Sequence, residues 1–409
     1  MEEAGAFSLG NPARVTLLDI ACGMPLGCNS DRPPLPRRSS LEEFATRLLS
    51  TSFGRGPCYM PFSGGRESSV WLAIATRYAR RHGHGDPVPI TLRYPGLAFP
   101  EQLRLQERVI ARLGLADWER VEPDNDLDLI GPIAGAALRR TGPFWPPNAY
   151  VMAPLLEAAR GGVFVLLTGL GDFFAWWRWA PLASVLAGHR RPTARDAALV
   201  GSMLVSVSLR ARAARRHGMP PPLPWLRPAA ERRALALLTA RQAAVPVPFN
   251  RAMTTQITHR CFLAAAGTFR ALGEGLGVTT QQPLCRPGVV ESLAGAGGWR
   301  GFGEQRAMLQ RLAGDLLPSD LLARRPAPDL TRVFFGEASR EFAADWTGAG
   351  LDESVVDVDA LRRTWLSDSP DPRTACLLQY AWLTEQLSAG SPPSPGDLLV
   401  THNNHKEEP

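Results

Sequence analysis

The chain of 409 residues is 45% hydrophobic and carries a formal net charge of +6, as expected of a globular protein with one large or two ordinary domains. All but one of its 45 basic residues are arginines, so the pI of about 9.3 reflects composition and does not by itself indicate a nucleic-acid partner. The most apolar stretch, residues 163–179, contains Asp172 and Arg178, and the N-terminus lacks a secretory signal, so we expect no membrane span and a cytoplasmic location.

Six cysteines are spread along the chain without a CxxC pair and without histidine at zinc-finger spacing, so we expect reduced, mostly structural thiols. A metal site on Cys22 and Cys28 is the alternative, but only Asp19 lies near them in sequence. Three histidines fit no ligand pattern and are expected at surface or helix positions: His189, His217 and His259.

The first 50 residues are expected to form a short segment ahead of the main domain. Residues 15–20 predict a strand, and a connector rich in Pro and Arg follows at residues 31–38. A helix is predicted from Ser40, with Glu42 and Glu43 in its first turn, where the helix dipole favours negative charge.

The main domain is expected over residues 51–390. Apolar runs predict strands, with helical patterns between the first three; the strands are residues 58–62, 88–93, 118–122 and 163–168, and the helices are residues 69–81 and 100–113. This alternation predicts an α/β fold in which a parallel sheet has flanking helices. Ligands bind such sheets beyond the carboxyl ends of the strands, where Ser63 and Gly169 fall.

Beyond residue 190 the pattern is helical, so a mainly helical C-terminal part is expected. A helix is predicted from Ala197 onward, and it carries a basic cluster that a solvated face explains at least as well as phosphate binding: Arg210, Arg212, Arg215 and Arg216. Residues 391–409 are rich in Pro and Ser and then polar, which predicts a disordered tail.

The clearest chemical pattern lies at residues 59–69, where an apolar strand, a Ser-Gly-Gly turn and a helix with polar first residues follow one another. Gly64 and Gly65 lack a Cβ, so the backbone can approach a ligand closely, and N–H groups at the helix start favour an anion. Ser63, Ser68 and Ser69 add hydroxyl donors. The stretch predicts a phosphate-binding loop; the alternative is a turn in which the glycines only relieve crowding and the serines only cap the helix.

Residues 63–68, Ser-Gly-Gly-Arg-Glu-Ser, resemble the pyrophosphate loop Ser-Gly-Gly-x-Asp-Ser of the asparagine synthetase and β-lactam synthetase family, with Glu67 in place of the Asp. The resemblance extends over residues 56–345. It implies an adenine nucleotide alpha hydrolase-like fold of the PP-loop ATP pyrophosphatase type. ATP and Mg²⁺ are the implied cofactors, and Leu92 and Arg93 the implied contacts of the adenine.

Residues 167–174 are similar to the family's Ser-Gly-x-Gly-x-Asp-Glu-Leu-Phe, with one residue fewer before the aspartate. The resemblance puts Gly169 and Gly171 at the nucleotide and makes Asp172 share a magnesium ion with Glu67, in keeping with the hard oxygen ligands that Mg²⁺ takes. In the alternative, Asp172 only caps a turn. The aromatic residues that follow, up to Trp179, are expected to pack in the core, and the alternative is the wall of an acceptor pocket.

Residues 279–291 look like the family's Glu-x-Arg-x-Pro element, with Thr279 in place of the Glu that assists the attacking amine. Residues 303–318 resemble the stretch from Gly-x-x-Lys-x-x-Leu to Leu-Leu-Pro, which puts Arg306 at the family's essential lysine. By this resemblance Arg306 stabilises charge on the adenylate and pyrophosphate, and it acts in catalysis with Glu67 and Asp172. A guanidinium offers donors to phosphate oxygens but does not transfer a proton at working pH.

The resemblance implies an ATP-dependent carbon–nitrogen ligase that forms AMP and pyrophosphate. It would adenylate a small-molecule or peptide carboxylate for attack by an amine, without nucleic acid or membrane. Glu2 stands where a glutaminase nucleophile would be, and family members without a glutaminase serve natural product biosynthesis, among them the lasso-peptide macrolactam synthetases.

Two alternatives remain at this point. A degenerate, non-catalytic homologue would bind nucleotide or peptide as the partner of another protein of its pathway, and the departures at Glu67, Thr279 and Arg306 favour it. A tRNA-modifying pyrophosphatase would need a paired or reactive cysteine and an RNA-binding appendage, and the sequence offers neither.

Overall fold

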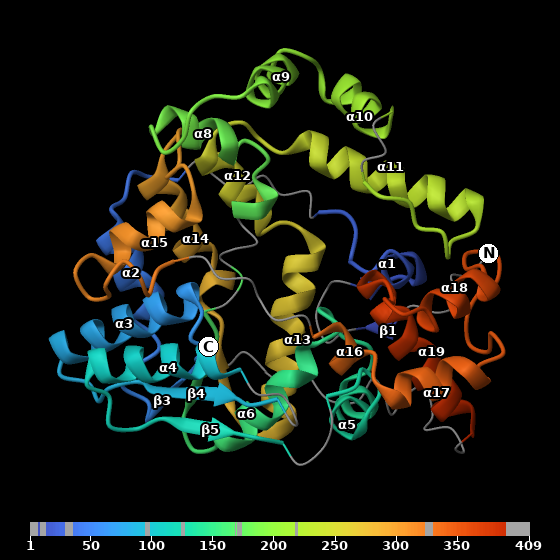
Figure 1. Ribbon diagram of the computed structural model, residues 1–409, viewed down its shortest axis with the longest axis horizontal. Helices are drawn as coiled ribbons and strands as arrows, with labels where there is room; N and C mark the ends of the chain where they lie inside the picture. The colour runs from blue at the N-terminus through green and yellow to red at the C-terminus, as the bar shows by residue number, and fades with distance from the viewer. Residues whose placement is uncertain are drawn as a thin grey trace, which may run out of the picture.

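The computed structural model describes residues 7–8, 14–28, 36–94, 99–123, 127–167, 169, 174–216, 220–323 and 330–389. A five-stranded sheet lies in one part of the molecule, with α3 and α4 along it, while α8 to α11 line the upper edge of the view and α17 to α19 lie on the opposite side from the sheet (Figure 1). The expected tail, residues 391–409, lies outside the described residues.

The five strands are all parallel, in the order β5-β4-β3-β6-β7. Their bounds are β3 (Cys58–Pro61), β4 (Val88–Leu92), β5 (Glu119–Val121), β6 (Val163–Val165) and β7 (Thr279–Gln281). The α/β prediction with a parallel sheet and flanking helices is therefore confirmed, and so are the four predicted strands, each ending one to three residues earlier than expected. β7 was not predicted, because Thr279, Thr280 and Gln281 form no apolar run.

Helices connect and cover these strands. In the first half of the chain they are α2 (Leu41–Leu49), α3 (Arg66–Arg81), α4 (Pro100–Leu113), α5 (Pro132–Thr141), η1 (Ala149–Met152) and α6 (Ala153–Ala158). In the second half they are α8 (Ala180–Leu186), α9 (Ala194–Met203), α10 (Val207–Arg216), α11 (Pro228–Ala244), α12 (Phe249–Gln256), α13 (Arg260–Leu276), η2 (Pro283–Cys285), α14 (Pro287–Gly297) and α15 (Gln305–Ala313). The last are α16 (Thr331–Phe334), α17 (Glu337–Asp345), α18 (Val358–Trp365), η3 (Pro372–Thr374) and α19 (Ala375–Ala389). The mainly helical C-terminal part is thus as predicted.

Both faces of β6 are buried, as its apolar composition predicts for a central parallel strand, while the edge strand β5 is largely exposed. Val163 and Val165 belong to a core formed with α2, α3, α14 and α15. Phe164, between them, belongs to a second core with α5, α6, α13 and α19. The alternation of β6 side chains between two cores shows that helices cover this strand on both of its faces.

The expected strand at residues 15–20 is wrong. Val15 ends a two-residue strand, β2 (Arg14–Val15), which pairs with β1 (Phe7–Ser8), and the chain then forms α1 (Leu17–Ala21). Thr16 and Asp19 make a capping box, in which the Thr16 N–H donates to Asp19 Oδ2 at 2.8 Å. Because this cap satisfies the free N–H groups of the helix start, it outweighs the strand preference of the apolar run.

The predicted helix from Ala197 onward is also corrected. It is two helices, α9 and α10, which are separated at residues 204–206. The helix at Ser40 is confirmed, because the Ser40 side chain accepts a hydrogen bond from Glu43 N at the start of α2. None of the helices in the described part of the chain is both long and apolar enough to cross a bilayer.

Asp19 also ties the N-terminal segment to α13. Its side chain is 3% exposed, lies 2.9 Å from Arg260 Nη2, and accepts from Leu26 N at 2.7 Å. We expect Asp19→Ala to lower the free energy of unfolding by about 3–5 kcal/mol, since Arg260 would lose its charge partner in a buried setting. Urea unfolding followed by circular dichroism measures this loss. Asp86→Ala, which removes the exposed partner of Arg80, is the matched control with a loss below about 1 kcal/mol, and equal losses would contradict the assignment.

Candidate functional site

Glycines follow two neighbouring strands at the centre of the sheet. Ser63, Gly64 and Gly65 follow β3, and Gly169 follows β6, its hydrogen-bonded neighbour. After β3 the chain adds β4 and β5 on one side of β3, and then crosses to add β6 and β7 on the other. Ligands of open parallel sheets bind at such a reversal of strand order, because the loops on its two sides separate there.

The hydroxyls of the first turn bond to one another. Ser63 Oγ lies 3.1 Å from Ser68 Oγ and accepts from Gly65 N at 3.3 Å, while the Ser63 N–H donates to Ser68 Oγ at 3.3 Å. Ser63 and Gly65 are exposed, so this ring of donors faces solvent. The hydroxyl and backbone donors of the turn are thus engaged with one another, and the Ser68 hydroxyl also donates to the Gly65 carbonyl at 3.1 Å.

Helix α4 holds this turn from behind. Gln102 and Gln106 both donate to the Ser63 carbonyl, at 2.6 and 3.0 Å. Gly64 has φ +74°, and a Cβ there would lie 2.6 Å from Cγ of Gln106. Gly64 is thus required for both the left-handed backbone and the close approach of α4. The two glutamines were not predicted, because no local sequence pattern indicates that residues of one helix hold a loop elsewhere in the chain.

The turn leads directly into α3. Gly65 is the N-cap and provides no side-chain cap, so the first N–H groups of the helix have no capping acceptor from it. Glu67 and Ser68 lie in the first turn and are partly buried. Ser69 is fully buried, and its Oγ has no hydrogen-bond partner among the described residues. A ligand at the exposed surface of the turn would reach Ser63 and Ser68 before Ser69.

The start of α15 lies against the start of α3, although the two are more than 200 residues apart in the chain. Gln305 Nε2 donates to Glu67 Oε2 at 2.8 Å, and Arg66 Nη2 donates to Gln305 Oε1 at 3.4 Å. Arg306 is the next residue of α15 and is exposed. The structure therefore brings the start of α15, where Arg306 lies, against the segment of the first sequence match. Gln305 was not predicted as a site residue, because its position next to Arg306 is the one feature of the sequence that points to it.

The magnesium pair cannot be assembled from the described residues. Asp172 and Gly171 lie outside them, and so does Phe173. Among the residues that the structure describes, no three histidine, cysteine, aspartate or glutamate side chains gather as a metal site. The donor chemistry that is present fits Mg²⁺ bound partly through phosphate oxygens, since Glu67 supplies a carboxylate beside the loop donors.

The remaining predicted contacts lie at neighbouring strands. Leu92 ends β4, and the Arg93 N–H donates to Val121 O at 2.7 Å, so this N–H group is engaged in pairing with β5. Gly169 has φ +99°, in the left-handed region that favours glycine, and no atom of the described residues lies within 4 Å of a Cβ built there. Thr279 is exposed at the start of β7, next to β6.

The predicted packing role of the aromatic run is confirmed for Phe174, Trp177 and Trp179, while Trp176 is half-buried and lines a larger cavity. Phe174, Trp177 and Trp179 are buried in the core, and the Trp177 and Trp179 indoles donate to the Val247 and Val245 carbonyls at 3.2 and 3.1 Å. The thiol prediction also holds for the described cysteines, all six of which are free. Burial raises the pKa of Cys22 to about 12, so it stays protonated and is a poor metal ligand beside the exposed Cys28.

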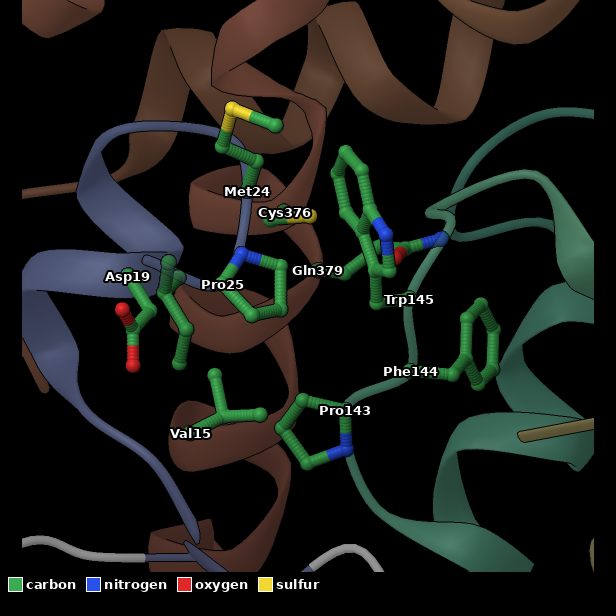
Figure 2. A pocket seen from close by; sticks show the side chains of 10 residues that line it. Val15, Asp19, Met24, Pro25, Pro143, Phe144, Trp145, Cys376 and Gln379 are labelled. Carbon is green, nitrogen blue, oxygen red and sulfur yellow. The ribbon is translucent and has the colours of Figure 1, made fainter. Parts of the chain in front are cut away.

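A small void near the N-terminus is not a ligand site. Figure 2 shows it between Pro25, Pro143 and Trp145, with Cys376 and Gln379 of α19 behind. Its volume of about 10 Å³ is close to the smallest space that holds one water molecule. A second cavity, of about 720 Å³, is large enough for an organic ligand and is lined by α9, α10 and α11.

Comparisons with protein-family models and with curated proteins found no match.

Gly64→Ala tests how tightly the loop is fitted. We expect it to destabilise the protein by more than the roughly 1–2 kcal/mol of left-handed strain, because its Cβ would displace Gln106 from the Ser63 carbonyl. Gly114→Ala is the matched control. Gly114 has φ +61°, and no atom of the described residues lies within 4 Å of a Cβ built there, so this substitution adds backbone strain without a steric clash. Urea unfolding of both variants compares them. Equal losses of stability would show that the contact with α4 is not needed.

Proposed function

We propose that this protein is an ATP-dependent, AMP-forming amide-bond synthetase. The substrate carboxylate attacks the α-phosphorus of ATP, pyrophosphate leaves, and an amine then attacks the acyl-adenylate and releases AMP. The observation that carries the proposal is the hydrogen bond between Gln305 and Glu67. It brings together, at one edge of the sheet, two sequence segments that resemble the family, residues 63–68 and residues 303–318.

The residues of the loop support this assignment. Ser63 and Ser68 hydroxyls, together with N–H groups at the start of α3, are suited to hold the departing pyrophosphate. The hydrogen bond between the two hydroxyls already fixes their orientation. A bound phosphate oxygen would replace the hydroxyl oxygen that accepts this bond, and the backbone of the turn would not have to change. The support from Gln102 and Gln106 keeps the loop in place during this exchange.

Glu67 and Arg306 would stabilise negative charge on the phosphate oxygens in two different ways. Glu67, with Asp172, would hold Mg²⁺, which when bound neutralises charge on the phosphate oxygens. Arg306 would donate to the phosphate oxygens as negative charge grows in the transition state. The Gln305 amide joins α3 to α15, and so sets the spacing of these two charged residues.

The first test separates the charge of Glu67 from its structural contact. Glu67→Gln keeps an oxygen that can accept the hydrogen bond from Gln305, but it removes the negative charge of the carboxylate that would bind Mg²⁺. We expect Mg²⁺-dependent ATP binding and ATP–pyrophosphate exchange, measured with a panel of carboxylic acids and peptides, to fall at least about hundredfold. Asp172→Asn should do the same.

Glu107→Gln, an exposed position of α4, is the control and should change neither quantity. Wild-type protein that binds no ATP in the presence of Mg²⁺ would contradict the proposal. ATP binding that depends on Glu67, without exchange for any acid, would favour the non-catalytic homologue.

The second test concerns Arg306. We expect Arg306→Ala to lower kcat by about 10²–10³ while the affinity for ATP changes little, because its bonds would form mainly in the transition state. Arg306→Lys should recover part of the rate, since the charge is retained. Arg311→Ala, at an exposed position of the same helix, is the matched control. Equal losses in kcat and in ATP affinity for Arg306→Ala would contradict this role.

A further inference from the structure

The cavity of about 720 Å³ lies between helices of the C-terminal part and is separate from the phosphate loop in its lining residues. Its walls come from α9, α10, α11 and the ends of α12 and α13, the first three of which lie together at the upper edge of Figure 1. Leu199, Leu238 and Val245 are among its apolar lining residues. The volume lies within the range of roughly 300–1,000 Å³ found for small-molecule pockets.

Three arginines also line this cavity. Arg178 and Arg210 both lie over the Trp179 ring, with their guanidinium carbons 4.8 and 5.7 Å from its centroid. Arg241 stacks on Trp176, its guanidinium carbon 3.5 Å from the ring centroid. The aromatic faces hold the three cations at the wall, since each ring attracts positive charge to its face.

These cations have no carboxylate beside them in the described part of the chain. The described lining residues include no aspartate or glutamate, and the described ion pairs include none of the three arginines. Burial and then the charge of Arg210 lower the pKa of Arg178, and burial lowers the pKa of Arg241. The positive charge of the wall is thus held at a free-energy cost that a bound anion would reduce.

Two polar atoms of the wall lack hydrogen-bond partners among the described residues. They are Nε of Arg210 and Nδ1 of His259, and both are buried. Burial, and then the charge of Arg241, lower the pKa of His259 to about 4, so its ring is neutral at pH 7 and adds a polar but uncharged group. His259 was expected at a surface or helix position; it is the N-cap residue of α13, and it also lines this cavity.

We propose that this cavity binds an amphiphilic organic anion, with a carboxylate or phosphate group at the arginines and an apolar body along the helices. Charge complementarity argues for the anion, and the apolar lining argues for a hydrocarbon or aromatic body. A wholly polar anion would leave the apolar wall in contact with water. A neutral apolar molecule would leave the three guanidinium groups without an anionic partner, since Arg241 otherwise donates only to sulfur atoms among the described residues, to Cys261 Sγ at 3.1 Å and Met24 Sδ at 4.0 Å. The inference does not rest on the function proposed for the phosphate loop.

The test uses probes that differ only in the head group. Calorimetric titration of the full chain with dodecanoate, dodecyl phosphate and dodecyltrimethylammonium, each below its micelle concentration, compares an anionic with a cationic head on one hydrocarbon body. We expect the anions to bind and the cation not to bind, and the better of the two anions identifies the head group. Arg210→Gln should weaken anion binding by about tenfold to hundredfold, the range for losing a hydrogen bond to a charged group.

Arg212→Gln is the matched control, because Arg212 is an exposed residue of α10 that does not line the cavity. Its affinity for the anions should equal that of the wild type. Ala214→Trp, which adds bulk to the wall without changing its charge, should abolish binding, and circular dichroism checks that each variant is folded. The proposal is overturned if no anion binds, if the cation binds as well as the anions, or if Arg212→Gln weakens binding as much as Arg210→Gln does.

Discussion

Burial of the central strand β6 on both faces is the constraint on which the other features depend. Val163 and Val165 belong to one core and Phe164 to the other, so helices must cover β6 from both sides. The second half of the chain supplies much of this cover through α13, α14, α15 and α19. Because α15 joins the same core as α3, the start of α15 comes against the start of α3, and the contact between Gln305 and Glu67 follows from core packing.

The same constraint selects the place of the candidate site. β3 is the first strand of the sheet and takes neighbours on both sides, so the turns after β3 and β6 lie at the reversal of strand order. A loop at this position needs a backbone that can turn sharply and still be held in place. Gly64 allows the turn, and the two glutamines of α4 hold the Ser63 carbonyl. Donors fixed in this way favour an anion without much rearrangement.

The anion sites that we propose at the loop and in the large cavity would attract negative charge by different physical means. At the loop, backbone N–H groups and small hydroxyls carry partial charges, and a metal ion held by Glu67 would add to them. In the cavity, full guanidinium charges are held on aromatic rings within an apolar wall. The first arrangement suits a compact, highly charged phosphate group. The second suits a single charge attached to an apolar body.

The sequence by itself determined the elements whose signals are local. Several elements were predicted because their apolar runs, glycines and caps lie within a few residues of each other. They are strand β3, the Ser-Gly-Gly turn, and helices α2, α3 and α4. Tertiary structure alone decided β7, whose Thr279, Thr280 and Gln281 carry no apolar pattern and become a strand by pairing with β6. It also decided the support of the loop by α4, the place of Gln305, and the gathering of arginines from separate segments around one cavity. These features depend on residues that are distant in the chain and meet only when the helices pack, so no local periodicity marks them.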